Sequence, residues 1–431
     1  MDYGQAIDFL YTSRASFERD GVMGYKPGLE TTLSLSEMFG APHRELRAIH
    51  VAGTNGKGSV SHLLASILAE RGLKVGLYTS PHFVDFNERV KINGTPMPHD
   101  EITRFVDEYQ EMDSQLSPSF FELTTVMAFR YFVQQKVDVA VVETGLGGRL
   151  DSTNIIMPDL SVITNVSYDH TDLLGNSLAE IAGEKAGIIK RHVPVVVGMA
   201  HGEVREVLER KAEEMQAPII FAQDAKIIRG ATDRMGHLLI KTWKYDRLDS
   251  PWAAAYQVQN INTALAAVEE LVKQGYGISG THVKRGVANV DVNTGFTGRW
   301  SLLSKNPTVI CDSGHNVGAL SQTIIQLKSC KYKTLRMVMG FMADKDVDKM
   351  LSLMPTSRTK YYFTQAHCSR AMDAHELQKK AIKHHLSGEC YESVAEAFDA
   401  ALSHSGEKDM VFVGGSMYVL AELLAHIRQD G

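Results

Sequence analysis

Short apolar runs alternate with amphipathic segments along most of the chain. The run Leu46–Val51 is followed by a glycine-rich stretch and then by apolar residues at positions 60, 63, 64, 67 and 68, which share one face of a helix. Gly72 ends this segment, and the next apolar run is Val75–Tyr78. A strand, a helix and a second strand in this order predict a βαβ unit, and hence a parallel sheet with right-handed crossovers.

Further apolar runs extend this sheet. Val137–Val142, Leu160–Val166 and Val193–Val197 are continuous rather than alternating, as is typical of strands that are covered on both faces. The stretch Ile227–Ser250 mixes charges with aromatic residues, and we expect a hairpin excursion from the first domain there. Periodicity lapses over the polar, glycine-bearing stretch Asp291–Gly298, which predicts a domain boundary.

The alternation starts again beyond this boundary. The expected strands are Thr308–Asp312, Arg336–Met339, Lys360–Phe363 and Met410–Val413, and the expected helices are Ala319–Leu327, Val347–Leu353, Ala374–His385, Val394–Ser403 and Tyr418–Ile427. The sequence therefore predicts an α/β protein of two domains. Residues 1–295 are expected to form a domain with a parallel sheet, and residues 296–431 a smaller, doubly wound, Rossmann-like domain.

Composition excludes several classes of protein. Lys and Arg number 45 against 51 Asp and Glu, a net charge of −6, so no basic excess draws the chain to nucleic acid or to an anionic membrane. No apolar run reaches the roughly 18 residues of a membrane span, and the first residues do not resemble a secretory signal. The four cysteines show no CxxC spacing, so we expect a reduced, cytoplasmic protein without disulfides or structural zinc.

The strongest chemical signal is the segment AGTNGKGS at residues 52–59. It lies between a predicted strand and a predicted helix, where glycines let backbone N–H groups point inward and the helix N-terminus favours an anion. Lys57 adds a mobile charge for the β- and γ-phosphates. Ala52 occupies the first glycine position of the strict P-loop pattern, and Gly58 precedes Ser59. The segment therefore predicts that residues 1–295 are a P-loop NTPase-like, ATP-binding domain. The alternative is a glycine-rich turn with a solvated lysine.

Acidic and imidazole groups are expected at the same edge of the sheet. Glu143 ends one predicted strand and His170 follows the next, and ligands of parallel sheets bind beyond the carboxyl ends of the strands. A carboxylate there suits Mg²⁺, which takes oxygen ligands. The residues alone leave other interpretations open, since Glu143 could be an ordinary strand end and His170 a structural or solvated side chain. Lys185, in the predicted helix Leu178–Lys190, could be an ordinary surface lysine.

Several motifs follow one another in a specific order. They are GTNGKGS (53–59), TSPH (79–82), NERV (87–90), ETGLGGRLDSTN (143–154), DHTDLLG (169–175), GEKAGIIK (183–190), Gln257 with Asn260, GRW (298–300), DSGHN (312–316) and DKD (344–346). Together they resemble the folylpolyglutamate synthase and dihydrofolate synthase family, which is related to the Mur peptide ligases. The resemblance covers nearly the whole chain. ETGLGGRLDSTN and DHTDLLG are its most specific parts, whereas GTNGKGS is shared with the wider superfamily.

The resemblance implies a role for individual residues. The ATP contacts would be Asn55, Gly56, Lys57, Gly58, Ser59, Asn260, Arg299 and Asp312; the Mg²⁺ ligands would be Ser80, Glu143 and His170; and the substrate contacts would be Ser119, Phe120, Phe121, Glu122, Leu150, Asp151, Ser152 and His315. Lys185 matches a lysine that is carbamylated in this family. Lys57, Lys185, His170 and Arg299 would serve the chemistry directly. ATP, Mg²⁺ and a carbamylated Lys185 are the implied cofactors, with K⁺ as a further candidate.

The resemblance also implies an activity. The chain would be an ATP-dependent, ADP-forming ligase that adds L-glutamate to dihydropteroate, to folate γ-carboxylates or to both, in the cytoplasm and as a monomer. One alternative is a Mur-type ligase that acts on a cell-wall nucleotide precursor, and another is a non-catalytic nucleotide switch. The chain departs from the family pattern at Ser313, Gly314 and Val317, where DGAHNP is common, and at Thr297, where proline is usual.

Overall fold

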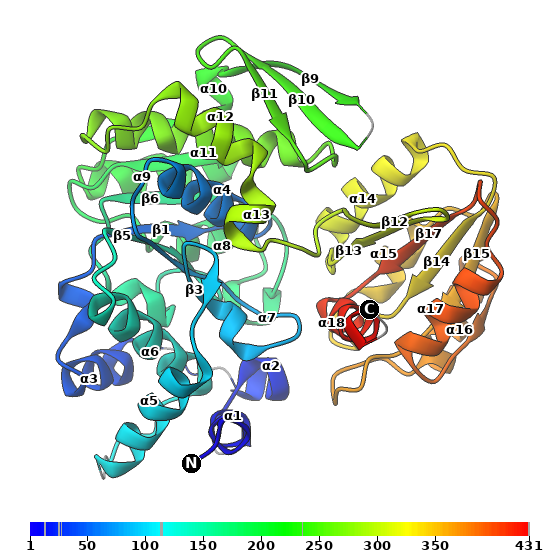
Figure 1. The fold of residues 1–431 in the computed structure, drawn as a ribbon, viewed down its shortest axis with the longest axis horizontal. Helices are drawn as coiled ribbons and strands as arrows, with labels where there is room; N and C mark the ends of the chain where they lie inside the picture. The colour runs from blue at the N-terminus through cyan, green and yellow to red at the C-terminus, as the bar shows by residue number, and fades with distance from the viewer. Residues whose placement is uncertain (13, 25, 27, 113–114, 235, 430–431) are drawn as a thin grey trace. The chain divides into compact units, whose positions relative to one another are not determined.

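The computed structural model describes the chain from Met1 to Gln429 apart from residues 13, 25, 27, 113–114 and 235. The chain forms two compact units. The first unit comprises Met1–His82, Phe86–Pro251 and Gln257–Phe296, and the second comprises Phe83–Asp85, Trp252–Tyr256 and the chain from Thr297 onward. Figure 1 shows both units as ribbons coloured along the chain. Two short segments of the second unit are thus inserted in the sequence of the first.

The first unit is built on an eight-stranded sheet. Its strands are β1 (Ala48–Ala52), β2 (Val75–Tyr78), β3 (Val90–Ile92), β4 (Thr95–Pro96), β5 (Val139–Glu143), β6 (Leu160–Asn165), β7 (Val195–Met199) and β8 (Ile219–Phe221). They lie in the order β4-β3-β2-β5-β1-β6-β7-β8. Strands β2, β5, β1, β6, β7 and β8 run parallel, and β3 and β4 form an antiparallel edge. Strands β1, β2 and β5 are buried along their whole length, as their continuous apolar sequences predict.

Helices cover both faces of this sheet. On one face α4 (Lys57–Glu70) contacts β1, β2 and β5, and α11 (Gln257–Lys273), α12 (Gly280–Ala288) and α13 (Val290–Thr294) pack against α4. The opposite face has one core with α5 (His99–Glu111) and α6 (Phe120–Gln134), and another with α8 (Leu178–Ala186) and α9 (Gly202–Glu214). The remaining helices of the unit are α1 (Tyr3–Thr12), α2 (Phe17–Asp20), α3 (Glu30–Met38), α7 (Thr171–Leu174) and α10 (Ala222–Ala225).

Three local predictions need correction. The excursion near residue 240 is a three-stranded antiparallel sheet, formed by β9 (Ile228–Arg234), β10 (His237–Thr242) and β11 (Arg247–Ser250), and not a hairpin. The polar stretch at the predicted domain boundary contains the helix α13. Helix α8 ends at Ala186, four residues before the predicted end, because the N–H groups of Ile188 and Ile189 bond to carbonyl oxygens three residues back and not four.

The second unit has a six-stranded sheet. Its strands are β12 (Ser301–Lys305), β13 (Thr308–Asp312), β14 (Leu335–Met339), β15 (Thr359–Phe363), β16 (Gly388–Cys390) and β17 (Met410–Gly414), in the order β12-β13-β17-β14-β15-β16, with β12 antiparallel. Helices α14 (Val317–Ser329), α15 (Val347–Ser352) and α16 (Ala374–Lys383) pack on one face, and α17 (Val394–Ser403) and α18 (Met417–Gln429) on the other. This is the predicted doubly wound arrangement. Among the described residues no helix is long and apolar enough to cross a membrane.

Candidate active site

Four neighbouring strands of the first unit bring most of the predicted site residues to one edge. Strands β2, β5, β1 and β6 lie side by side and run parallel. Ser80 follows β2, Glu143 ends β5, the loop 53–56 follows β1, and His170 follows β6. Because the carboxyl ends of parallel strands meet at one edge, groups far apart in sequence converge there.

The phosphate loop depends on two glycines. Gly53 and Gly56 have φ angles of +150° and +83°, which non-glycine residues rarely adopt. A Cβ at Gly53 would collide with the Thr164 hydroxyl, and one at Gly56 would collide with the Asn260 amide oxygen. The glycine-rich sequence is therefore a steric requirement, and it places Asn260 directly against the loop.

Hydrogen bonds from β6 hold this loop in shape. The Asn55 N–H donates to Asn165 Oδ1 at 3.0 Å, and the Thr164 hydroxyl donates to the Asn55 carbonyl oxygen at 2.6 Å. Lys57 begins α4, and its Nζ lies 3.1 Å from the Gly53 carbonyl oxygen and 3.3 Å from that of Thr54. The lysine ammonium thus already lies over the loop that would hold the phosphates.

A short polar chain links this loop to helix α11. The Gln257 amide donates to the Ser59 hydroxyl at 3.3 Å, and the Asn260 amide donates to Gln257 Oε1 at 2.8 Å. All three side chains are buried. Ser59 and Asn260, both predicted nucleotide contacts, therefore belong to one connected network.

The oxygen donors of the edge suit Mg²⁺. Glu143 is 5% exposed, and its carboxylate lies beside the first turn of α4, since a Cβ on Gly58 would be 3.6 Å from its Oε2. His170 caps α7 in a left-handed conformation, and its N–H donates to Asp169 Oδ1 at 3.0 Å. The described residues contain no cluster of three His, Cys, Asp or Glu side chains. One carboxylate with a hydroxyl and phosphate oxygens is nevertheless a normal Mg²⁺ environment, so the residues fit the ion.

Lys185 is buried and not on the helix surface. It lies in the last turn of α8 with 3% of its surface exposed. Burial, assisted by the charge of Lys57, lowers the pKa of Lys185 to about 7, while Asp169, Asp151 and Glu184 act in the opposite direction. These interactions place the lysine among charges from the phosphate loop, from the segment after β6 and from the glycine-rich loop after β5. The interpretation as an ordinary surface lysine is wrong.

The glycine-rich loop 144–151 is docked on α8. The Arg149 N–H donates to the Glu184 carbonyl oxygen at 2.8 Å, and the Arg149 guanidinium pairs with the Glu184 carboxylate at 2.8 Å. The Asn154 amide donates to the carbonyl oxygens of Arg149 and Gly187. Gly148 allows this approach, because its Cβ position is 2.9 Å from the Glu184 carbonyl oxygen. The helix that carries Lys185 and the predicted substrate loop are therefore one packed structure.

The buried Asp151 carboxylate accepts hydrogen bonds from that loop and from the short helix that follows it. It is 5% exposed and caps the short helix η4 (Ser152–Ile155), which also contains the predicted contact Ser152. Its Oδ2 accepts from the Leu146 N–H at 2.7 Å, and its Oδ1 accepts from the N–H and the hydroxyl of Thr153. Burial raises the pKa of Asp151, and these hydrogen bonds oppose the rise. Leu150, just before it, is half-buried.

The predicted substrate segment 119–122 has a second role that the sequence analysis missed. Ser119 and Glu122 form a capping box at the start of α6, with Ser119 N–H to Glu122 Oε2 at 2.7 Å. Phe120 is buried in the core, 1% exposed. Phe121 is half-buried, and its ring occupies the space that a Cβ on Gly145 would need. Phe121 is thus the side chain of this segment that faces the glycine-rich loop, and the S-x-x-E pattern was the overlooked signal.

The remaining predicted contacts lie in the second unit. Asp312 ends β13 and is buried; its Oδ2 accepts from the Tyr256 hydroxyl at 2.6 Å and from the Trp300 N–H at 2.8 Å. The Arg299 guanidinium donates to the hydroxyl of Ser313, which is fully buried. His315 is half-buried, with Nδ1 3.1 Å from the Ser313 carbonyl oxygen. Arg299, Asp312 and His315 are therefore brought together within this unit.

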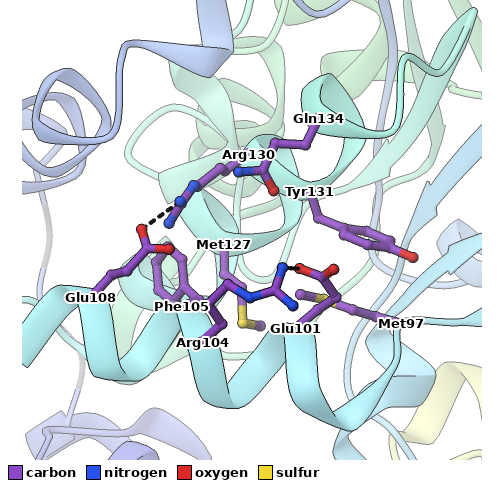
Figure 2. A pocket seen from close by; sticks show the side chains of 9 residues that line it. All are labelled: Met97, Glu101, Arg104, Phe105, Glu108, Met127, Arg130, Tyr131 and Gln134. Atoms are coloured by element: carbon purple, nitrogen blue, oxygen red, sulfur yellow. Dashed lines mark hydrogen bonds and ion pairs between the residues drawn. The ribbon is translucent and has the colours of Figure 1, made fainter.

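A small pocket of the first unit lies away from these residues. The pocket lies between α5 and α6 and has a volume of about 10 Å³. Figure 2 shows the residues that line it, among which Arg130 pairs with Glu108 and Arg104 pairs with Glu101. This volume is about one water molecule, too small for an organic substrate. None of the predicted site residues lines it.

Comparisons with known proteins agree with this architecture. The family model "Mur ligase middle domain" matches residues 51–268, and "Mur ligase, glutamate ligase domain" matches residues 298–417. The two matches thus place the chain in the Mur ligase superfamily. The Bacillus subtilis dihydrofolate synthase/folylpolyglutamate synthase is 33% identical over 420 residues, which cover 94% of this chain and 96% of the relative. The Escherichia coli protein of the same description is 31% identical and covers 92% and 90%.

Solved structures give the same assignment. Escherichia coli FolC in complex with DHPP and ADP superposes with a TM-score of 0.86 and 29% identity, over 100% of this chain and 98% of the other. The Mycobacterium tuberculosis folylpolyglutamate synthase complexed with ADP gives a TM-score of 0.88 and 28% identity, over 99% of both chains. This chain belongs to the dihydrofolate synthase/folylpolyglutamate synthase family.

Proposed function

We propose that the chain is an ATP-dependent, ADP-forming ligase that joins the amine of L-glutamate to the carboxylate of dihydropteroate, to the γ-carboxylate of a folate, or to both. One observation carries this proposal: Lys185, buried in α8, is within electrostatic reach of Lys57, Asp169 and Asp151. Charges from the start of α4, from the segment after β6 and from the loop after β5 therefore act on one buried side chain, which supports a shared site. Relatives named for this activity match almost the whole chain.

The chemistry needs an activated carboxylate. A carboxylate oxygen attacks the γ-phosphorus of ATP, the bond to the bridging oxygen breaks, and ADP leaves. The glutamate amine then attacks the carbonyl carbon of the acyl phosphate, phosphate leaves with the bonding electrons, and the amine loses a proton. The Lys57 ammonium and the N–H groups at the start of α4 offset the charge on the transferring phosphoryl group.

The metal site is assigned to Ser80, Glu143 and His170. When bound, Mg²⁺ neutralises the phosphate oxygens and orients them for in-line displacement. Glu143 supplies a full negative charge at the end of β5, and the Ser80 hydroxyl supplies a neutral oxygen after β2. K⁺ remains a further candidate ion, and titration of activity with K⁺ at constant ionic strength tests it.

Lys185 is proposed to act as a carbamate. The neutral amine attacks CO₂, a nitrogen–carbon bond forms and a proton leaves, so that an anion replaces a cation. The pKa of about 7 makes the neutral amine available near neutral pH. The carbamate would relieve repulsion with Lys57 and would offer oxygens to a metal ion or to its bound waters.

The remaining site residues complete the assignment. Nucleotide binding is assigned to Asn55, Gly56, Gly58, Ser59 and Asn260 in the first unit, and to Arg299 and Asp312 in the second. Phe121, Leu150, Asp151 and Ser152 bind the pterin substrate, with His315 also assigned to substrate. We further propose a monomeric, cytoplasmic enzyme, and light scattering tests the oligomeric state.

An ADP-release assay tests the proposed function. Dihydropteroate and a reduced folate are each offered with ATP, Mg²⁺ and L-glutamate. ADP formation that requires both the pterin compound and glutamate supports the proposal, and the two pterin compounds show which activity is present. ADP release with neither compound, together with turnover of a cell-wall nucleotide precursor, would overturn it.

A further inference from the structure

A histidine in the middle of β1 is connected to the predicted substrate loop. His50 is fully buried, and its Nε2 lies 2.8 Å from the Thr153 hydroxyl. Thr153 is also fully buried, and its hydroxyl and N–H both contact Asp151 Oδ1. His50 and Thr153 are separated by 103 residues, so this contact ties the loop after β5 to the central strand of the sheet.

The direction of each hydrogen bond follows from counting protons. An ionised Asp151 can only accept, so the Thr153 hydroxyl must donate its single hydrogen to the carboxylate. The same hydroxyl oxygen therefore accepts from His50, which must carry its hydrogen on Nε2. His50 Nδ1 is buried and, among the described residues, has no hydrogen-bond partner. His50 therefore donates to Thr153, and Thr153 donates to Asp151.

Burial favours the neutral form of the His50 imidazole. Desolvation, assisted by the charge of Lys190, lowers the pKa of His50 to about 3. The imidazole is then neutral near neutral pH. A neutral ring of fixed tautomer serves as a hydrogen-bond donor of fixed direction, and it has no role as an acid or base.

We propose that His50 is a positioning residue for the glycine-rich loop 144–151, and that it acts through Thr153 on Asp151. This inference rests on the proposed function, since it assigns the loop to the pterin substrate. Asp151 already receives the Leu146 N–H and the Thr153 N–H. The Thr153 hydroxyl donates a further hydrogen bond that orients the Asp151 carboxylate. The hydrogen bond from His50 Nε2 in turn orients that hydroxyl. No atom of His50 is expected to touch substrate.

The test compares His50→Leu with His50→Gln in the ADP-release assay. Leucine fills the space without a donor, whereas the glutamine amide can place an N–H near the position of Nε2. We expect His50→Leu to raise the KM for the pterin substrate about tenfold, with the KM for ATP changed less than twofold, and His50→Gln to restore most of the affinity. His62→Leu replaces another buried histidine of the same unit and should leave the KM for the pterin substrate unchanged.

A double-mutant comparison tests whether the effect of His50 on the substrate depends on Asp151. In an Asp151→Asn background, His50→Leu should raise the KM for the pterin substrate less than twofold further, because the carboxylate through which His50 acts is already absent. Equal increases in the KM for ATP and for the pterin substrate, full additivity of the two substitutions, or no recovery in His50→Gln would overturn the proposal. If His50→Leu does not fold, Thr153→Val against Thr153→Ser makes the same comparison at the other end of the bond.

The wild-type enzyme separates this proposal from the proposed function. If the wild-type protein releases no ADP in the presence of a pterin compound and glutamate, the proposed function fails before any variant is compared. If it does turn over, the variants decide the role of His50 alone.

Discussion

Lys57 is the first residue of α4, and its ammonium is directed back over the phosphate loop. Its side chain is half-buried and, among the described residues, contacts two backbone carbonyl oxygens that α4 does not depend on. We therefore expect removal of this side chain to affect folding little.

We expect Lys57→Ala to abolish turnover and to leave the melting temperature nearly unchanged. Loss of a charge that acts on the transferring phosphoryl group costs about 3–4 kcal/mol of transition-state stabilisation, a loss of a hundredfold or more in kcat. Steady-state kinetics at saturating ATP measure it. Lys273→Ala, which removes a lysine with a 68% exposed side chain, is the control and should keep full activity. Retention of a tenth of wild-type turnover would refute the assignment of Lys57.

Two predictions concern Lys185: the activity of an alanine variant and the pH dependence of carbamate formation. We expect Lys185→Ala to be severely impaired and partly rescued by acetate, whose carboxylate can occupy the vacated space, but not by chloride at equal ionic strength. In the wild type, labelling with ¹³CO₂ should give a carbamate signal that grows as pH rises through about 7, because the neutral amine is the reactive form. Near-normal activity of Lys185→Ala, together with no carbamate signal in the wild type, would show that Lys185 has only a structural role.

The same pKa fixes the sign of a stability effect in the unmodified protein. The folded-state pKa of Lys185, about 7, lies below its ordinary value of 10.5. Between these two values the unfolded chain binds more protons than the folded one, so the free energy of unfolding rises with pH across this window. Below pH 7 the cost of burying the cation is present in full. Denaturant titrations of the wild type and of Lys185→Met at several pH values measure the difference.

At the scale of elements, the contact between the glycine-rich loop and α8 is the most sensitive to a small change. A Cβ on Gly148 would be 2.9 Å from the Glu184 carbonyl oxygen and 3.2 Å from that of Lys185, so the backbone would have to shift. Gly183, in the same helix, has nothing within 4 Å of its Cβ position. The chain thus offers a matched pair of glycines.

We expect Gly148→Ala to lower the free energy of unfolding by about 1–3 kcal/mol, as overpacking does, and to raise the KM for the pterin substrate. Gly183→Ala should instead stabilise the protein by up to about 1 kcal/mol, because alanine is the better helix former. Chemical denaturation and substrate titration measure both. Equal effects of the two substitutions would show that the loop does not need its close approach to α8.

The sequence predicted the elements with continuous apolar cores and located the site at their ends. Strands β1, β5 and β6 were recognisable because each is a buried run, and Glu143 could be placed because it ends one of them. The contacts of His50 and Tyr256 could not be predicted, because their partners are 103 and 56 residues away and no local pattern marks them. The short inserted segments 83–85 and 252–256 were missed for the same reason, since their packing is decided by tertiary contacts.

At the scale of the whole molecule, the chain passes repeatedly between its two units, and Asp312 binds two of the segments next to these passages. It accepts from the Tyr256 hydroxyl, one residue before the chain re-enters the first unit, and from the Trp300 N–H, shortly after the final passage at residues 296–297. Trp300 has a φ of +49°, a conformation that costs energy in a residue other than glycine. Asp312 therefore holds a strained segment that includes Arg299.

We expect Tyr256→Phe to destabilise the second unit by about 1.5–3 kcal/mol, because the substitution removes a hydrogen bond to a charged carboxylate. Arg299 lies in the segment held by the same carboxylate, so the KM for ATP should rise while the KM for the pterin substrate stays within twofold. Differential scanning calorimetry and limited proteolysis near residues 252–256 measure the first effect, and kinetics the second. Tyr391→Phe removes a hydrogen bond to the exposed Glu389 and should change stability by no more than about 0.5 kcal/mol. If Tyr256→Phe is equally neutral, Asp312 does not depend on the inserted segment, and Arg299 must be positioned by the Ser313 hydroxyl without it.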